Sequence, residues 1–304
     1  MRLYGSTYFN PTDIPMNLCT STLPGFSFEE SLDLASVAGY QGIELRVHDD
    51  YHVTLDDLFI RHREIRRMVE SRKLELSVFN TYYGLTDVPA VDTMIDICQQ
   101  SGVKYFRVAL PLAGHADVRN RSAHQAILPS YQHHEPPSDM LHSVRRDLRG
   151  LESRATAAGV CALVEIHWGT VMSSFSSAHA LLNDIDPQAV AITFDPANMI
   201  IEGREDWDYG IQLLRDRIAN VHIKNVSWER GEQGWKWRWD GLWHGMVDWP
   251  KLFGLLVNEG GYRGMFAMED FRVPEDADQA RLHLLDQREE TRFLLWHAKA
   301  EQLI

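Results

Sequence analysis

Four short apolar runs in the second half of the chain each stop on a side chain that can bind a metal. The runs end at Glu165, Asp195, His222 and Glu269. Their β-branched and aromatic residues are typical of strands that are buried on both faces, as in a parallel sheet. Packing alone gives no reason for a carboxylate or an imidazole at the end of such a strand. We therefore expect these four side chains to meet around one divalent metal ion.

The rest of the chain alternates between strand-like and helix-like patterns. Eight strands are predicted, at residues 16–20, 42–46, 74–79, 105–110, 161–165, 191–195, 220–224 and 264–269. Strands that alternate with helices form a parallel sheet with right-handed crossovers. Eight such units favour a closed α/β barrel, the (β/α)8 or TIM barrel, over an open sheet. An open nucleotide-binding sheet would need a glycine-rich turn after its first strand, where Leu23-Pro24-Gly25 stands.

The helices are predicted from helical spacing and from capping residues. Ser27 with Glu30 forms a capping-box pattern, Thr54 begins the second helix, and Ser176 or Ser177 caps a short helix before the sixth strand. Further helices are predicted over residues 91–101, 139–158, 207–214, 248–259 and 275–300.

Two segments interrupt this alternation, so the barrel is expected to carry long loops after strands four and seven. Residues 111–138 hold four irregularly spaced histidines, which points to loop or interface residues rather than to a second metal site. Residues 228–243 hold five tryptophans among charged residues. Above the barrel mouth these indoles could stack on a sugar ring, or they could form an oligomer interface, where tryptophan is enriched. Because the helical pattern shows no break in composition, one domain is predicted over residues 1–304.

Charge and cysteine content narrow the classes of partner. The formal net charge is −13 without a Lys/Arg-rich block, which argues against nucleic-acid binding because phosphates need clustered cations. No run approaches the roughly 20 apolar residues of a membrane span. Residues 1–17 are polar and lack the apolar core of a signal peptide. Three cysteines without paired spacing suit a reducing compartment, so we expect a cytoplasmic protein without membrane partners, and homo-oligomerisation is left open.

The predicted cluster has the donor set of a hard metal site. In an eight-stranded barrel, side chains at the C-terminal ends of the strands gather on one face, where the active sites of this architecture lie. Three carboxylates and one imidazole suit Mn²⁺ first, with Mg²⁺, Co²⁺ or Zn²⁺ as alternatives. A single carboxylate at a strand end is more often a cap or an ion-pair partner. Residues that can bind a metal stand at the same depth on four consecutive strands, which favours a shared role as metal ligands.

Six short motifs carry a resemblance to a known family. They are Gly42-Ile43-Glu44-Leu45, Glu165-Ile166-His167, Phe194-Asp195-Pro196-Ala197-Asn198, His222-Ile223-Lys224, Gly245-Met246-Val247-Asp248 and the final Glu269. In this order and spacing the chain resembles the xylose-isomerase-like superfamily of sugar isomerases and epimerases. That superfamily includes ketose 3-epimerases, hydroxypyruvate isomerase and inosose dehydratase, and the likeness spans about residues 14–272.

The resemblance implies roles for the four strand-end residues. All four match the metal ligands of the family, and Glu165 and Glu269 also match its acid and base on opposite faces of the substrate. It implies a metal-dependent sugar or sugar-derivative isomerase or epimerase that removes a proton next to a carbonyl by way of a metal-stabilised enediolate. A keto-sugar or keto-inositol dehydratase is the alternative, because expulsion of a β-hydroxyl from the same intermediate dehydrates the substrate. A sugar-binding barrel without turnover is a further alternative, which the complete acid–base pair disfavours.

Residues beside the ligands are candidates for binding a small carbohydrate substrate. Alternation along the strands places His167 and Lys224 on the same faces as the ligands that precede them. Both are expected to contact substrate hydroxyls, unless His167 bonds a backbone carbonyl and Lys224 neutralises the carboxylates. Glu44 is a third candidate, and it shares a strand face with Arg46, so an interior Glu44–Arg46 pair is the alternative.

Asn198 is the fourth candidate, and it departs from the ketose 3-epimerase pattern. Those enzymes typically carry a histidine three residues after the aspartate of strand six, and an arginine after the histidine of strand seven. Here Asn198 and Lys224-Asn225 stand instead. The His-x-Lys pattern looks closer to the dehydratase and uncharacterised isomerase branches. The DNA endonuclease branch of the same fold binds three metals through further histidines. The net negative charge of this chain argues against DNA binding, and so against this branch.

Overall fold

The structure, a computed structural model, describes residue 10 and residues 13–113, 136–232 and 234–300. Most of the segment predicted as the long loop after strand four lies outside these residues. Its four histidines lie outside them too: His115, His124, His133 and His134.

Eight parallel strands close into a barrel with the order β1-β10-β7-β6-β5-β4-β3-β2, which confirms the predicted (β/α)8 architecture. Every neighbouring pair of strands is parallel. The strands are β1 (Met16–Cys19), β2 (Gly42–Val47), β3 (Glu75–Thr81), β4 (Tyr105–Val108), β5 (Cys161–Glu165), β6 (Val190–Phe194), β7 (Ile218–Ile223) and β10 (Met265–Met268).

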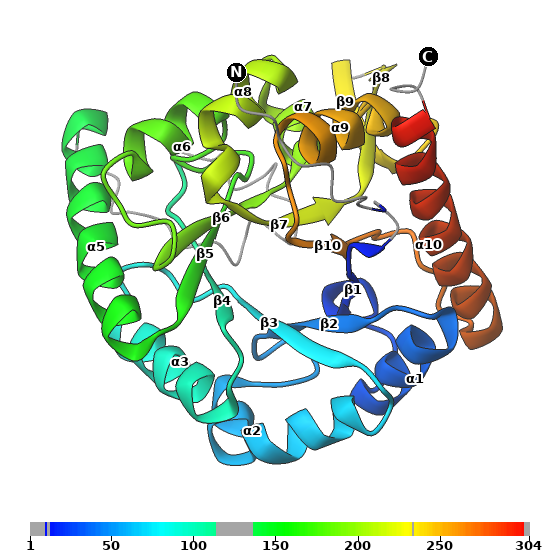
Figure 1. Ribbon diagram of the computed structural model, residues 1–304, viewed down its shortest axis with the longest axis horizontal. Coiled ribbons are helices and arrows are strands. Elements are labelled where there is room, and N and C mark those ends of the chain that lie inside the picture. Colours follow the sequence, from blue (N-terminus) through cyan, green and yellow to red (C-terminus); the bar gives the residue numbers. More distant parts are fainter. Residues whose placement is uncertain (1–9, 11–12, 114–135, 233, 301–304) are drawn as a thin grey trace.

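Helices surround the barrel on its outside (Figure 1). They are α1 (Phe28–Ala38), α2 (Leu55–Glu70), α3 (Val88–Ser101), α5 (Pro137–Ala158), α6 (Phe175–Leu182), α7 (Pro196–Glu202), α8 (Trp207–Leu214), α9 (Trp249–Gly254) with the π-helical turn η5 (Leu255–Glu259), and α10 (Ala277–Ala300). Their apolar faces bury against the strands, as the amphipathic spacing predicts. No helix among the described residues is long and apolar enough to cross a membrane.

Capping residues fix where several helices begin. Ser27 and Glu30 form the predicted capping box of α1, and Thr54 caps α2. The cap predicted for α6 is wrong: Ser174, rather than Ser176 or Ser177, occupies the N-cap. The reason is a reciprocal bond, in which the Ser174 hydroxyl accepts from the backbone N–H of Ser177 and the Ser177 hydroxyl accepts from the backbone N–H of Ser174.

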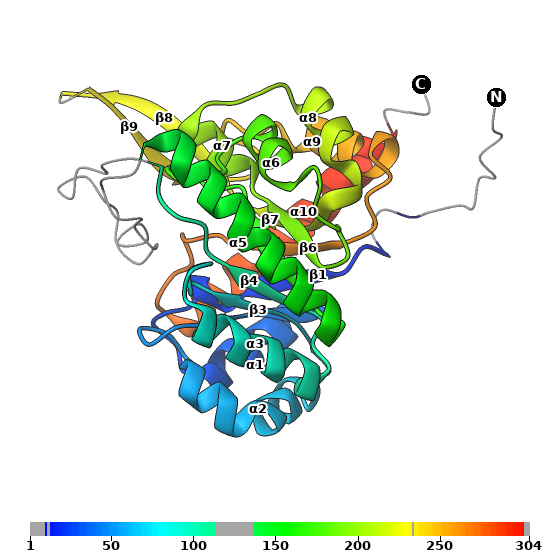
Figure 2. The ribbon, with the colours of Figure 1, turned by 90° about the vertical axis from the view of Figure 1, so that its left-hand side faces the viewer.

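Two elements at the mouth of the barrel were not predicted. One is α7, which begins directly after Asp195 with Pro196 at its first position. The other is a hairpin of β8 (Asn225–Gly231) and β9 (Gly234–Asp240), which occupies most of the tryptophan-rich segment. The hairpin leaves the end of β7 and projects beyond the barrel (Figure 2). Both elements therefore lie where the four strand-end side chains gather.

Candidate metal centre

The four predicted ligands come together at the C-terminal ends of their strands. Glu165 is the last residue of β5, Asp195 follows β6, His222 lies in β7, and Glu269 follows β10. One ligand atom from each lies within 4.8 Å of those of the others, and all four residues are buried. Convergence of this kind follows from the parallel strands, because their ends meet on one face of the barrel.

His222 is oriented so that one ring nitrogen faces the cluster and the other faces the barrel interior. Its Nδ1 lies 3.2 Å from Glu269 Oε2 and 3.4 Å from both Glu165 Oε1 and Asp195 Oδ2. Its Nε2 lies 2.9 Å from Glu44 Oε1. A carboxylate that accepts from one ring nitrogen, here Nε2, fixes the tautomer of a metal-binding histidine. The other nitrogen, here Nδ1, then keeps its lone pair for the metal.

Glu44 is itself held in place by two amides. The side chains of Asn80 and Asn220 both donate to its carboxylate, the latter at 2.8 Å. Glu44 is 1% exposed, so its charge is stabilised by these donors rather than by water. The interior pair with Arg46, which was the alternative to substrate contact for Glu44, does not form: Glu44 bonds His222, while Arg46 reaches Glu269 at 3.2 Å. Glu44 therefore lies behind the ligand cluster.

The unsatisfied Nδ1 of His222 supports the presence of a cation between the four ligands. Nδ1 of His222 is completely buried, and among the described residues it makes no hydrogen bond of acceptable geometry although three carboxylates surround it. A buried nitrogen that faces several carboxylate oxygens and has no hydrogen bond is unfavourable unless something else occupies the space between them. Three oxygens and one nitrogen at these positions fit a divalent ion of the Mn²⁺, Mg²⁺, Co²⁺ or Zn²⁺ type.

The charges around the cluster point the same way. Glu44 and the three carboxylate ligands contribute four negative charges, and three permanent cations contact the ligands. Arg107 Nε lies 2.7 Å from Glu165, Arg46 contacts Glu269, and Lys224 Nζ lies 2.7 Å from Asp195 and 2.6 Å from Glu269. The four carboxylates exceed these three cations by one negative charge, which either a proton on His222 or a bound cation offsets.

These contacts keep both candidate acid–base carboxylates ionised. Burial opposes ionisation of Glu165, but Arg107 and His222 outweigh it and hold the pKa of Glu165 well below its ordinary value. Burial likewise opposes ionisation of Glu269, but Lys224 and His222 outweigh it and hold its pKa well below the ordinary value. Burial would lower the pKa of His222, yet the surrounding carboxylates raise that pKa well above its usual range.

Two arginines that the sequence analysis did not assign to the site support these carboxylates. Arg46 from β2 and Arg107 from β4 lie 4.2 and 4.8 Å from the ring of Tyr82, one guanidinium for each candidate base. Cation–π contact with one shared ring fixes both guanidinium groups. Arg107 left a signal in the sequence, because it is a charged residue between Phe106 and Val108 in an apolar strand.

The four predicted substrate-binding residues are all buried at or near the cluster. Lys224 bridges Asp195 and Glu269, so it neutralises the carboxylates, which was the alternative to substrate contact. His167 lies 2.8 Å from the backbone carbonyl of Trp168 through Nδ1, again the alternative. Because burial lowers the pKa of His167, its ring is neutral at pH 7, with Nδ1 donating and Nε2 accepting.

Asn198 lies in α7 and connects the ends of β6 and β5 through two hydrogen bonds. Its backbone N–H donates to Oδ1 of Asp195 at 3.0 Å, and its side-chain amide donates to Oε1 of Glu165 at 3.0 Å. Asp195 thus uses one oxygen to cap α7 and turns the other toward the cluster. Oδ1 of Asn198 is buried and makes no hydrogen bond among the described residues, which leaves an acceptor without a donor next to Glu165.

Replacing Glu44 by glutamine is expected to weaken Mn²⁺ binding by about 10–100-fold, because an amide aligns the His222 ring less strongly than a carboxylate does. Titration calorimetry of the metal-free protein with MnCl2 measures the change. The control is Glu75→Gln, at an exposed position where β3 begins. An unchanged dissociation constant in Glu44→Gln would remove Glu44 from the metal centre.

Comparison with known proteins identifies the family of the chain. Residues 32–287 match the model of the family described as xylose isomerase-like TIM barrel. An inosose dehydratase of Lacticaseibacillus casei is 23% identical over 268 residues, which cover 83% of this chain and 85% of the relative.

Two solved structures share the fold. A xylose isomerase-like TIM barrel protein from Mycobacterium smegmatis in complex with magnesium superposes with a TM-score of 0.70 at 17% identity, covering 95% of this chain and 99% of that one. A 3-keto-D-glucoside 4-epimerase from E. coli gives a TM-score of 0.66 at 17% identity, covering 91% and 99%.

Proposed function

Because the chain belongs to the family of xylose isomerase-like TIM barrels, we propose that it is an enzyme that moves a proton next to the carbonyl of a small carbohydrate, as an isomerase or epimerase. Glu165, Asp195, His222 and Glu269 would hold one divalent cation, with Mn²⁺ as our first choice. Such a cation polarises a carbonyl and an adjacent hydroxyl. Mg²⁺ is the metal described for the Mycobacterium smegmatis structure.

One observation carries the proposal: two ionised carboxylates reach the cluster from different strands, each backed by an arginine. Glu269 follows β10 and Glu165 ends β5, and β7 and β6 separate these two strands in the barrel. Each carboxylate turns one oxygen toward His222 and the other toward its arginine. A carboxylate that is ionised and held in this way can accept a proton from carbon, and a partner on the other side can return one.

The neighbouring residues have separate tasks in this proposal. Nε2 of His167 and Oδ1 of Asn198 accept hydrogen bonds from substrate hydroxyls and so orient the sugar. Lys224 keeps Asp195 and Glu269 close together by bonding both. Arg46 and Arg107 stabilise the two bases as carboxylates until the proton arrives.

Solvent exchange tests the reaction class without knowledge of the substrate. The Mn²⁺-loaded protein is incubated in D₂O with a panel of ketoses, with and without phosphate, and the products are followed by proton NMR. We expect one carbon-bound proton of at least one ketose to exchange, and chelation with EDTA to stop the exchange. No exchange in any ketose, while the protein retains about one metal per chain, would refute the isomerase and epimerase reading.

A dehydratase is the second candidate, favoured by the likeness to the Lacticaseibacillus casei inosose dehydratase. The same site would remove the proton, and a hydroxyl one carbon further on would take a proton from the acid of the site and leave as water. Ultraviolet absorbance of the same incubations separates the two candidates, because an enone or a deoxy-diketone forms only when water is lost.

A further inference from the structure

The β8–β9 hairpin has one aromatic face. In its register Trp228 lies opposite Trp237, Val226 opposite Trp239 and Arg230 opposite Trp235. Directly opposed residues in an antiparallel pair point to the same side, and alternate residues of one strand do so too. Four of the five tryptophans of the segment therefore share one side of the ribbon.

The other face carries charges that already have partners. Glu229 pairs with Lys236 at 3.0 Å and with Arg238 at 3.4 Å, and Arg238 also reaches Asp240 at 3.0 Å. Ser227 donates to Asp240 at 2.7 Å. This network satisfies the polar face within the hairpin. The aromatic face is partly covered: Trp237 and Trp239 pack against the core, and Trp228 Nε1 donates to the backbone carbonyl of Ile200, while Trp235 is exposed.

The aromatic face reaches the metal centre through contacts between rings. The ring of Trp239 lies 5.2 Å from the Lys224 ammonium group, which bonds two of the ligands. Trp239 also packs on Phe271 at 5.2 Å and on Trp237 at 4.9 Å. The rings therefore form a wall that starts at the carboxylate cluster and continues outward.

A second series of contacts joins the same wall from the other side of the site. His167, the candidate for orienting the substrate, stacks on Trp168 with ring centroids 5.6 Å apart. Trp168 in turn meets Trp237 edge to face at 5.7 Å. Trp237 is therefore the ring on which both series meet.

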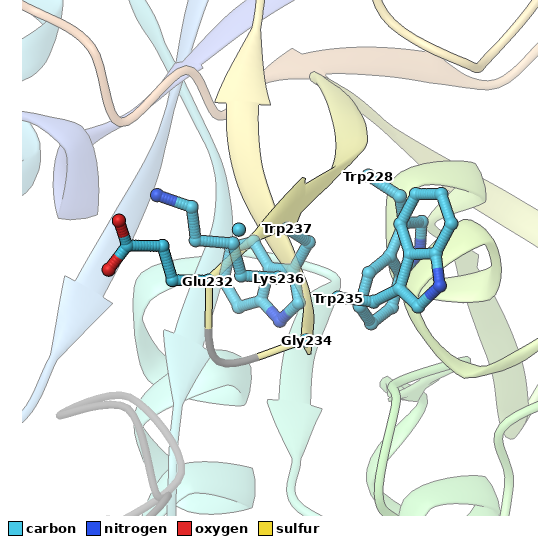
Figure 3. Close-up of a pocket in the computed structure, with 7 residues that line it drawn as sticks. Trp228, Glu232, Gly234, Trp235, Lys236 and Trp237 are labelled. Atoms are coloured by element: carbon cyan, nitrogen blue, oxygen red, sulfur yellow. The ribbon is translucent and has the colours of Figure 1, made fainter.

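Space is available at the outer end of this wall, where Trp237 is the ring of the wall that lines it. A cavity of about 750 Å³ opens along the hairpin and is lined by three of its tryptophans together with Glu232, Lys236 and two glycines. Figure 3 shows the indoles of Trp228 and Trp235 on one side of the ribbon and the side chains of Glu232 and Lys236 on the other. The volume is in the range of small-molecule sites.

We propose that Trp237, with Trp239 beside it, forms a subsite for a second ring, so that the substrate is a glycoside whose ring aglycone stacks on the indoles. The inference rests on the proposed function, because the keto sugar at the metal centre fixes where the second ring lies. An oligomer interface, the other use considered for these tryptophans, does not explain why the aromatic face is continuous with Lys224 and His167. Indole faces suit both the C–H face of a sugar and an aryl ring.

Binding of unreactive glucosides tests the subsite apart from catalysis. The probes are methyl, phenyl and glucosyl β-D-glucopyranoside, the last being cellobiose, titrated into the Mn²⁺-loaded protein and followed by tryptophan fluorescence or by calorimetry. Stacking on an indole is expected to make at least one ring-bearing probe bind about tenfold more tightly than the methyl glucoside. The phenyl and glucosyl arms show which kind of ring the subsite prefers.

Three variants locate the effect. Trp237→Ala should remove the preference for a ring-bearing probe, so that phenyl glucoside and cellobiose bind this variant no more tightly than methyl glucoside does, while Trp237→Phe should keep much of the preference because a ring remains. The matched control Trp296→Ala replaces an exposed tryptophan on α10 and should match the parent protein. Equal affinities for all three probes, or an unchanged preference in a folded Trp237→Ala, would overturn the subsite. Failure of proton exchange would instead overturn the proposed reaction and leave the binding difference in place.

Discussion

Replacement of Glu269 by glutamine is expected to lower the rate of solvent proton exchange by about 10²–10⁴-fold, the range for loss of a positioned acid or base. Glutamine keeps the size of the side chain and one oxygen for the cluster. It cannot accept a proton from carbon, and its amide N–H₂ must face Arg46, Lys224 or the cluster itself. The first two are donors as well, so the side chain loses partners that the carboxylate had.

The measurement is proton NMR in D₂O with the ketose that the parent protein exchanges. Glu269 is also a candidate ligand, so metal content is determined on the same sample, and the rate is compared at saturating Mn²⁺. Glu29→Gln, at an exposed position on α1, is the matched control and should retain the parent rate. Full activity of Glu269→Gln at normal metal content would exclude Glu269 as the acid or base.

Replacement of His222 by alanine is expected to reduce bound metal from about one ion per chain to a trace. The change removes the nitrogen donor at the centre of the three carboxylates. It also leaves Glu44 without the ring that it bonds, which is unfavourable for a carboxylate that is 1% exposed. Lys224 still bonds Asp195 and Glu269 and offsets part of their charge, so a cation binds there more weakly.

Two readouts check this expectation. Elemental analysis after dialysis against a slight excess of Mn²⁺ gives the metal content. Thermal unfolding gives the stabilisation by the metal, which at a free concentration of 100 times Kd is about 2.7 kcal/mol for the parent and should vanish in the variant. His179→Ala, on the outer helix α6, serves as the control. A metal-dependent shift of the same size in His222→Ala would mean that the ion binds elsewhere.

Much of the fold follows from local patterns in the chain. Short apolar runs between amphipathic helical patterns produced the eight strands, and the order of ring closure followed from the preference for adjacent parallel units. Caps such as Ser27 and Thr54 were predicted because their bonds lie within four residues. The helix α7 was missed although Asp195 with Pro196 is a start signal, because the aspartate had been considered only as a ligand.

The hairpin was missed for a different reason. Strand pairing in β8 and β9 joins residues as far apart in the chain as Asn225 and Asp240, and the alternation of tryptophan with charged residues fits a solvated ribbon rather than a buried strand. Trp235, Trp237 and Trp239 alternate with Lys236 and Arg238, which is a period of two. This period was the available signal for a two-faced strand.

The sequence by itself determined which side chains gather, and the tertiary structure decided what each one bonds. Glu165, Asp195, His222 and Glu269 meet because each lies at or next to the C-terminal end of a parallel strand, and these ends share one face of a barrel. Alternation placed Glu44 and Arg46 on one face of β2 but could not say which partner each would find. In the barrel, Glu44 reaches His222 of β7, and Arg46 reaches Glu269 after β10. The physical reason is that alternation is a local property of one strand, whereas contacts across the barrel depend on the tilt and stagger of all eight.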